Sequence, residues 1–304
     1  MNTALIGILF ALGACISWAA ANIVLRFGIA EMRIFPATAV SLLGGLLYVL
    51  VVNLIFDPGA IGRMESSVIL AFALVGVVQF LGSRSLFYRG VALIGVGRAT
   101  ALGGGSPIMG SLLAVFFLGE VVTLPLAIGI LAVVTGVAVI VSDNFDTTLA
   151  PHQSNLHKFI SQSKLGFITI MASSLVYSIA QVLARGLLSG EVSSIAGSLI
   201  TLGSGSLVLL VATTKDFKAN YNVPKNDLLW IFIAGVLASN GAMLSFLSLE
   251  RAPVVLVSPI IGITPLITLV LAAMFLRERE KLTLKVVLGS LVVVAGVTLV
   301  VLAK

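Results

Sequence analysis

Residues Val121–Ser142 read VVTLPLAIGILAVVTGVAVIVS, without a single Lys, Arg, Asp or Glu. A helix of about 20 apolar residues crosses the hydrocarbon core of a bilayer, so this stretch predicts a transmembrane helix. Nine other stretches share this property, and the shortest of the ten has 18 residues. These nine are Met1–Leu25, Ile34–Phe56, Ser66–Ser83, Ala99–Gly119, Leu165–Ala184, Val192–Thr214, Leu228–Leu249, Ala252–Leu276 and Val286–Ala303. The sequence therefore predicts ten spans, all helical because backbone polar groups in lipid need partners within their own segment.

The composition excludes the other broad classes of protein. Of 304 residues, 59% are hydrophobic and 10% are charged, with a mean hydropathy of +1.18. Because about 25% of residues in soluble domains are charged, a water-soluble globular fold could not cover its surface. The single cysteine, Cys15, excludes a disulfide scaffold, and long unbroken apolar stretches argue against an outer-membrane barrel. The predicted fold class is an all-α polytopic membrane protein.

The two halves of the chain repeat one another at an offset of 158 to 160 residues. The matched positions are Trp18 with Tyr177, Asn22 with Gln181, Arg26 with Arg185, Gly76 with Gly235, Gly82 with Gly241, Ser106-Pro107 with Thr264-Pro265, Glu120 with Glu278, Gly129 with Gly289 and Gly136 with Gly296. We therefore expect a first five-helix repeat over 1–144, a polar linker over 145–163 and a second repeat over 164–304. Five spans are an odd number, so the second repeat enters the membrane from the opposite side. Such a 5+5 inverted repeat is typical of secondary transporters.

The motifs of the fourth and fifth spans resemble a known family. Gly97-Arg98-Ala99, Ser106-Pro107, Phe117-Leu118-Gly119-Glu120, Gly129 and Gly136 look like the end of an EamA-type repeat, and the second half follows the same pattern. Two such repeats make the ten-helix members of the drug/metabolite transporter superfamily. The resemblance implies a carrier, more often an exporter, of amino acids or other small metabolites. It also implies a central cavity lined by the first, third, fourth, sixth, eighth and ninth spans.

Several polar side chains are candidates for lining that cavity. Trp18 and Asn22 share a helix face, as do Tyr177 and Gln181, because each pair is four residues apart. An aromatic ring beside an amide suits a small amphipathic ligand, although amides and aromatics also stabilise contacts between membrane helices. The further candidates are Gln79, Asn240, Ser106 and Thr264.

Two arginines, Arg84 and Arg98, are candidates for holding an anionic group. Ionisable side chains at membrane depth are functional hypotheses by default, and a guanidinium binds a carboxylate or phosphate through two donors. The alternative is that both side chains reach lipid headgroups. None of the ten stretches contains Asp or Glu. This favours a zwitterionic or anionic substrate over a cationic drug, and leaves a coupling ion or proton undetermined.

Helix-breaking residues stand at matching places in the two halves. The fourth span contains Gly103, Gly104, Gly105 and Pro107, and the ninth contains Pro259 and Pro265. Proline removes a backbone donor, and broken helices at matching places point to a transporter site and its gates. Close packing of helices is the alternative explanation. Glu120 and Glu278 are interpreted as helix-end charges at the membrane interface.

The predicted function is secondary transport by alternating access, with no enzymatic activity, no cofactor and no metal site. The alternatives are a channel, a non-transport membrane binding protein or a carrier of cationic compounds. The expected partners are a small molecule and the bilayer, without nucleic acid, and both a monomer and a homodimer fit. We expect a multi-pass protein of a prokaryotic plasma membrane. The basic loop residues favour termini on the outside, whereas the family resemblance favours the cytoplasm.

Overall fold

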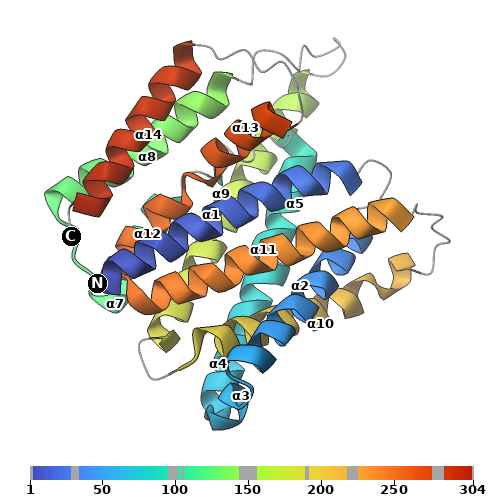
Figure 1. The fold of residues 1–304 in the computed structure, drawn as a ribbon. Coiled ribbons are helices and arrows are strands. Elements are labelled where there is room, and N and C mark those ends of the chain that lie inside the picture. The colour runs from blue at the N-terminus through green and yellow to red at the C-terminus, as the bar shows by residue number, and fades with distance from the viewer. Residues whose placement is uncertain are drawn as a thin grey trace. The chain divides into compact units, whose positions relative to one another are not determined.

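The computed structural model describes residues 3–28, 34–94, 102–103, 106–143, 156–188, 192–217, 225–275 and 284–302. Within these ranges all regular structure is helical, with no strand. The helices are α1 (Thr3–Gly28), α2 (Ile34–Phe56), α3 (Ala60–Arg63), α4 (Ser66–Gly76), the π-helix η1 (Val77–Ser83), α5 (Arg84–Ile94), α7 (Ser106–Leu118), α8 (Leu124–Asp143), α9 (Leu156–Leu188), α10 (Ser194–Phe217), α11 (Lys225–Arg251), α12 (Val254–Ile261), α13 (Thr264–Phe275) and α14 (Leu284–Leu302). Figure 1 shows their arrangement.

Each of the ten charge-free stretches contains helix, whereas α3 and α5 lie between stretches. Six described segments are long and apolar enough to cross a membrane, and four shorter apolar segments fall in the remaining stretches. The shorter ones are Ser106–Leu118, Leu124–Val139, Val254–Thr268 and Leu288–Leu302. This confirms the predicted all-α polytopic membrane fold. Helix α9 begins at Leu156, inside the segment expected to be a polar linker.

Proline helps to set where three of the helices begin. Pro107, Pro125 and Pro265 are each the second residue of their helix, in α7, α8 and α13. The first turn of a helix has no internal partner for its N–H groups, so a residue without an N–H is tolerated there. The matched pair Ser106-Pro107 and Thr264-Pro265 therefore opens a helix in each half of the chain.

The third span changes its winding in the middle. Helix α4 passes into η1, whose seven residues include Gln79, and then into α5. π-helical turns are rare and often occur at functional sites. Just before the change, Thr201 and Ser204 of α10 donate hydroxyl hydrogen bonds to the carbonyls of Phe72 and Ala73, at 3.3 and 2.9 Å. These two hydroxyls of α10 thus bind the last turns of α4, just before the π-helix η1 begins.

Contacts divide the chain into two compact units. The first, unit 1, comprises Met1–Leu81, Leu183–Pro253 and Ile267–Arg277, and the second, unit 2, comprises Gly82–Val182, Val254–Leu266 and Glu278–Lys304. Each unit therefore combines spans from both sequence repeats.

In unit 1, α1 lies along α11, α11 along α2, α2 along α10 and α10 along α4 (Figure 1). Two glycines allow the closest backbone approaches among these helices. A Cβ on Gly235 of α11 would lie 1.9 Å from the Ser41 carbonyl oxygen, and one on Gly76 of α4 would lie 2.1 Å from that of Thr201. Gly76 and Gly235 are repeat partners. The packing of α4 on α10 in the first repeat's third span therefore corresponds to the packing of α11 on α2 in the second repeat's third span.

In unit 2, α8 and α14 lie side by side (Figure 1), and α12 packs against α7. The contact between α8 and α14 is made by glycines of the two repeats. A Cβ on Gly129 would lie 2.9 Å from the Gly296 carbonyl oxygen, and one on Gly296 would lie 2.9 Å from that of Gly129. Small residues of this kind let membrane helices approach closely, here through a reciprocal contact between Gly129 of the first repeat and Gly296 of the second.

Candidate functional site

In unit 2, one face of α9 is lined with buried polar side chains. Ser174, Ser178 and Gln181 are all at least 94% buried, at 5%, 1% and 6% exposure. Their spacing of four and three residues places them on one stripe of the helix. Buried polar groups need hydrogen-bond partners, so each of these side chains needs a partner on α9 itself or on a helix beside it.

Gln181 is the centre of the network on this stripe. Its Nε2 donates to the Tyr177 hydroxyl oxygen at 2.7 Å, within the same helix face. Its Oε1 accepts a hydrogen bond of 3.2 Å from the Ser258 hydroxyl of α12. The amide therefore joins the sixth span to the first part of the ninth through neutral groups alone.

The start of α7 approaches the same stripe. The Ser178 hydroxyl donates to the Ser106 carbonyl oxygen at 3.2 Å. A Cβ on Gly110 would lie 2.8 Å from the Ser258 hydroxyl oxygen. The buried Ser111 hydroxyl, 4% exposed as a residue, has no hydrogen-bond partner among the described residues. The sequence candidates Ser106, Tyr177 and Gln181 thus come together with Ser178, Ser258 and Gly110, which were not predicted.

The ninth span is broken beside this network. Helix α12 ends at Ile261, Gly262 and Ile263 form a turn, and α13 begins at Thr264. The Thr264 hydroxyl donates to the Ile261 carbonyl oxygen at 2.7 Å, which satisfies one acceptor at the helix end. Pro259 lies inside α12 and Pro265 opens α13.

The two predicted helix breaks also meet within unit 2. A Cβ on Gly262 would lie 2.8 Å from the Pro107 ring, so the break in the ninth span lies against the start of α7. Gly103 lies in the short helical segment 102–103, whereas Gly104 and Gly105 lie outside the described residues. The role of these residues in gating stays a prediction.

Unit 1 holds a second polar network, around Asn240 of α11. Its Nδ2 donates to the Ser17 hydroxyl oxygen at 2.8 Å, and its Oδ1 accepts from the Tyr48 hydroxyl at 2.8 Å. Trp18 donates its indole N–H to the Ala238 carbonyl oxygen at 2.9 Å. Asn240 therefore links α1, α2 and α11, which is the helix-to-helix role that amides often have in membranes.

We expect Asn240→Leu to destabilise the protein by about 1–2 kcal/mol, because it leaves the Ser17 and Tyr48 hydroxyls without their partner. Thermal unfolding in detergent measures the change. Asn226→Ala is the control, since Asn226 is exposed near the start of the same helix. Equal unfolding temperatures for Asn240→Leu and the native protein would contradict this structural role.

Asn22 is less firmly placed than its repeat partner Gln181. It is exposed, and its Nδ2 lies 3.4 Å from the Thr268 hydroxyl oxygen. The long distance indicates a weak hydrogen bond. The two amides are repeat partners in the sequence but differ in burial.

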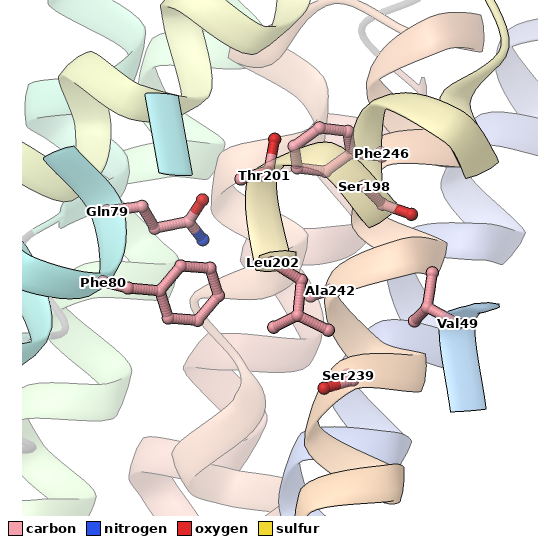
Figure 2. A pocket seen from close by; sticks show the side chains of 9 residues that line it. All are labelled: Val49, Gln79, Phe80, Ser198, Thr201, Leu202, Ser239, Ala242 and Phe246. Carbon is pink, nitrogen blue, oxygen red and sulfur yellow. The ribbon is translucent and has the colours of Figure 1, made fainter. Parts of the chain in front are cut away.

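A small cavity in unit 1 contains Gln79 (Figure 2). It is lined by residues of α2, η1, α10 and α11, namely Val49, Gln79, Phe80, Ser198, Thr201, Leu202, Ser239, Ala242 and Phe246. The Gln79 amide points toward the other lining residues in Figure 2. The space available to the centre of a water molecule is about 10 Å³, which is room for a single water. In the described structure this cavity is too small for a metabolite.

The arginines occupy different environments. Arg84 is partly buried at the first residue of α5, directly after Ser83, whereas Arg98 lies outside the described residues. In unit 2, Ser173 of α9 donates to the Ser83 carbonyl oxygen at 2.7 Å. Arg84 is therefore the neighbour of Ser83, which contacts Ser173 of α9, and Ser173 lies one helical turn before Tyr177.

Arg185, the repeat partner of Arg26, has a specific role in unit 1. Its guanidinium donates to the carbonyl oxygens of Leu249 and Glu250, the latter at 3.0 Å. These carbonyls end α11 and lack partners within the helix. Arg185 is thus the cap of this helix end, while the side chain of Arg26 lies outside the description.

A model of the EamA-like transporter family matches residues 5–142 and again residues 164–302. The chain belongs to this family. The EamA-like proteins are membrane transporters of small molecules, and the two matches agree with the two repeats read from the sequence. The resemblance to the drug/metabolite transporter superfamily is confirmed.

A solved structure, described only as the crystal structure of a protein, resembles this EamA-like transporter in fold. The TM-score is 0.80 and the sequence identity 14%, and the match covers 98% of this chain and 96% of the other. No curated protein gives a significant match. At this identity the likeness supports the fold of the transporter and carries no information on its substrate.

Sequence reasoning missed Ser178 and Ser258 in this EamA-like transporter. Serines are common in membrane helices, and their small side chains give no strong signal on their own. The available signal was the spacing of Ser174, Ser178 and Gln181 along one predicted helix, which marks a polar stripe. Nothing in the sequence indicated that Ser258 would meet it, because that contact joins residues far apart in the chain.

Proposed function

We propose that this EamA-like protein is a secondary carrier of a small zwitterionic or anionic metabolite, most simply an amino acid, and that it works by alternating access in the direction of export. The observation that carries the proposal is the network of Tyr177, Gln181 and Ser258 beside the broken ninth span. Broken helices leave backbone groups available for a ligand. A neutral amide with two hydroxyls can exchange its internal hydrogen bonds for those of a substrate.

The charge of the spans supports the substrate class. No Asp or Glu lies in the ten charge-free stretches, so a cationic substrate would lack a carboxylate partner there. Arg84 follows the Ser83 contact with α9 and supplies a cationic group in the same unit. A guanidinium recognises a carboxylate through two parallel hydrogen bonds. Arg98 is the second cationic candidate, from the sequence alone.

Counterflow in proteoliposomes tests the proposal. The panel is radiolabelled amino acids, organic acids, sugar phosphates and quaternary amines, which represent zwitterions, anions and cations. We expect saturable counterflow of a zwitterion or anion, because a carrier exchanges bound substrate whereas a channel does not accumulate label in this way. Uptake of quaternary amines alone would overturn the substrate class, and absence of counterflow with every compound would overturn the carrier.

In the same assay we expect Arg84→Gln to lower uptake of the anion or zwitterion about 10-fold or more, because a charge-assisted pair is lost. Arg98→Gln is measured beside it. Arg89→Gln is the matched control, since Arg89 is an exposed arginine of the same helix, α5. If Arg84→Gln and Arg98→Gln both leave uptake and substrate preference unchanged, arginine recognition is wrong.

The proposed location is a prokaryotic plasma membrane, because the loops are short and the predicted spans take up most of the chain. A coupling ion or proton has no assigned carrier. One chain holds both repeats, so transport by a monomer is sufficient, and a homodimer would add no missing repeat.

A further inference from the structure

The loop between α7 and α8 holds a carboxylate in a defined position. Helix α7 ends at Leu118, and Gly119 follows with φ of +66°, a conformation that favours glycine. The next backbone nitrogen, that of Glu120, donates to the Ala114 carbonyl oxygen at 3.3 Å, back in the last turns of α7. Glu120 is therefore tied to the end of α7 and turned out of the helix line.

The Glu120 carboxylate binds the start of α12 with both oxygens. Its Oε1 accepts from the Val254 backbone N–H at 2.9 Å, and its Oε2 accepts from the Val255 N–H at 2.9 Å. These groups belong to the first turn of α12, where N–H groups have no partner within the helix. A carboxylate there also interacts favourably with the positive end of the helix dipole. The helix-end charge expected at Glu120 thus has a specific role as a two-oxygen cap of α12, whereas its place at the membrane interface stays a prediction.

The helix that Glu120 caps is the one that carries Ser258. All eight residues of α12 are buried, from Val254 to Ile261. Ser258 lies one turn after Val254 and donates to Gln181, and the helix ends three residues later at the break in the ninth span. Two hydrogen bonds to one carboxylate limit both the rotation and the axial position of so short a helix.

We propose that Glu120 is a positioning residue of the transport site, whose two hydrogen bonds orient α12 so that Ser258 meets Gln181. The proposal rests on the proposed function for its effect on transport, but the cap itself is independent of transport. Glu120 touches no substrate in this scheme. Glu120 lies in the loop between the fourth and fifth spans and acts indirectly, by placing the Ser258 hydroxyl that bonds Gln181.

Hydrogen exchange of the full chain in lipid nanodiscs tests the cap directly. In Glu120→Ala, we expect exchange of the Val254 and Val255 amides to accelerate about five- to ten-fold, because both lose a charge-assisted bond. Glu120→Gln keeps one acceptor oxygen, so its exchange rates at Val254 and Val255 are expected to lie between those of the native protein and of Glu120→Ala. Glu65→Ala is the matched control, since Glu65 precedes α4 but makes no side-chain cap to it. Unchanged exchange at Val254 and Val255 in Glu120→Ala would overturn the proposal.

Counterflow of the substrate found for the native protein separates positioning from general stability. We expect Glu120→Ala and Ser258→Ala each to raise the apparent KM, and the double variant to be no worse than the more affected single variant, because both act through one hydroxyl. Additive effects, or an unchanged KM with faster exchange, would reject a positioning role. If the native protein shows no counterflow, the carrier proposal fails. The positioning role is then tested by hydrogen exchange alone, and unchanged exchange of the Ser258 amide in Glu120→Gln would reject it.

Discussion

Replacing Gln181 with leucine is expected to lower the transport rate about 10-fold or more while the protein still folds. The buried amide both donates to Tyr177 and accepts from Ser258, and a buried polar group that loses its partner costs about 1–3 kcal/mol. Leucine has a similar volume, so the helices keep their spacing. Counterflow in proteoliposomes measures the rate, and size-exclusion chromatography checks the fold.

Two further variants make the Gln181 result specific. Tyr177→Phe removes one hydroxyl from the network, and its effect should overlap with that of Gln181→Leu in a double-mutant cycle, because the two residues share a hydrogen bond. Thr135→Val is the control, since the exposed Thr135 hydroxyl bonds only the Leu131 carbonyl of its own helix. Native transport in Gln181→Leu would exclude the network from the transport site.

Replacing Gly235 with valine is expected to have the largest effect on stability. A Cβ at this position would lie 1.9 Å from the Ser41 carbonyl oxygen, and this neighbour is backbone, which cannot rotate away. Helices α11 and α2 must therefore separate, and overpacking of this kind costs about 3 kcal/mol or more. Thermal unfolding in detergent should show a clearly lower transition temperature than that of the native protein.

The matched control for Gly235 is Gly62→Ala, at an exposed position of α3 where an added Cβ has no atom within 4 Å. It should leave the transition unchanged or slightly raise it, because alanine restricts the unfolded chain more than glycine does. A Gly235→Val protein as stable as this control would show that α2 and α11 do not approach closely in the bilayer.

The spacing of charged residues predicted the helices well. Charged side chains are costly in lipid, so the membrane spans appear in the sequence as stretches without charge. The repeat pairs were also informative about packing. Gly76 and Gly235, matched by sequence alone, make corresponding close contacts with α10 and α2. Glycine is informative in this way because a residue without a side chain allows the backbones of two helices to approach closely.

The arrangement of the candidate site was only partly predictable. Tyr177 and Gln181 were identified because they lie four residues apart on one helix and recur in the repeat. The contact of Ser258 with Gln181 and that of Glu120 with α12 were not predicted, because each joins residues more than seventy positions apart. A carboxylate at a helix end has the same sequence signature whether it faces water or caps another helix. That choice depends on tertiary packing, which local pattern does not encode.

The interleaving of the repeats has a consequence for biosynthesis. Within unit 1, α2 packs on α11 and α4 packs on α10, so both seams join an early span to one made much later. When the ribosome has completed the first five spans, Gly76 and Ser41 still lack the neighbours that they have in the finished protein. The contacts of α2 with α11 and of α4 with α10 can therefore form only after α10 and α11 have left the translocon.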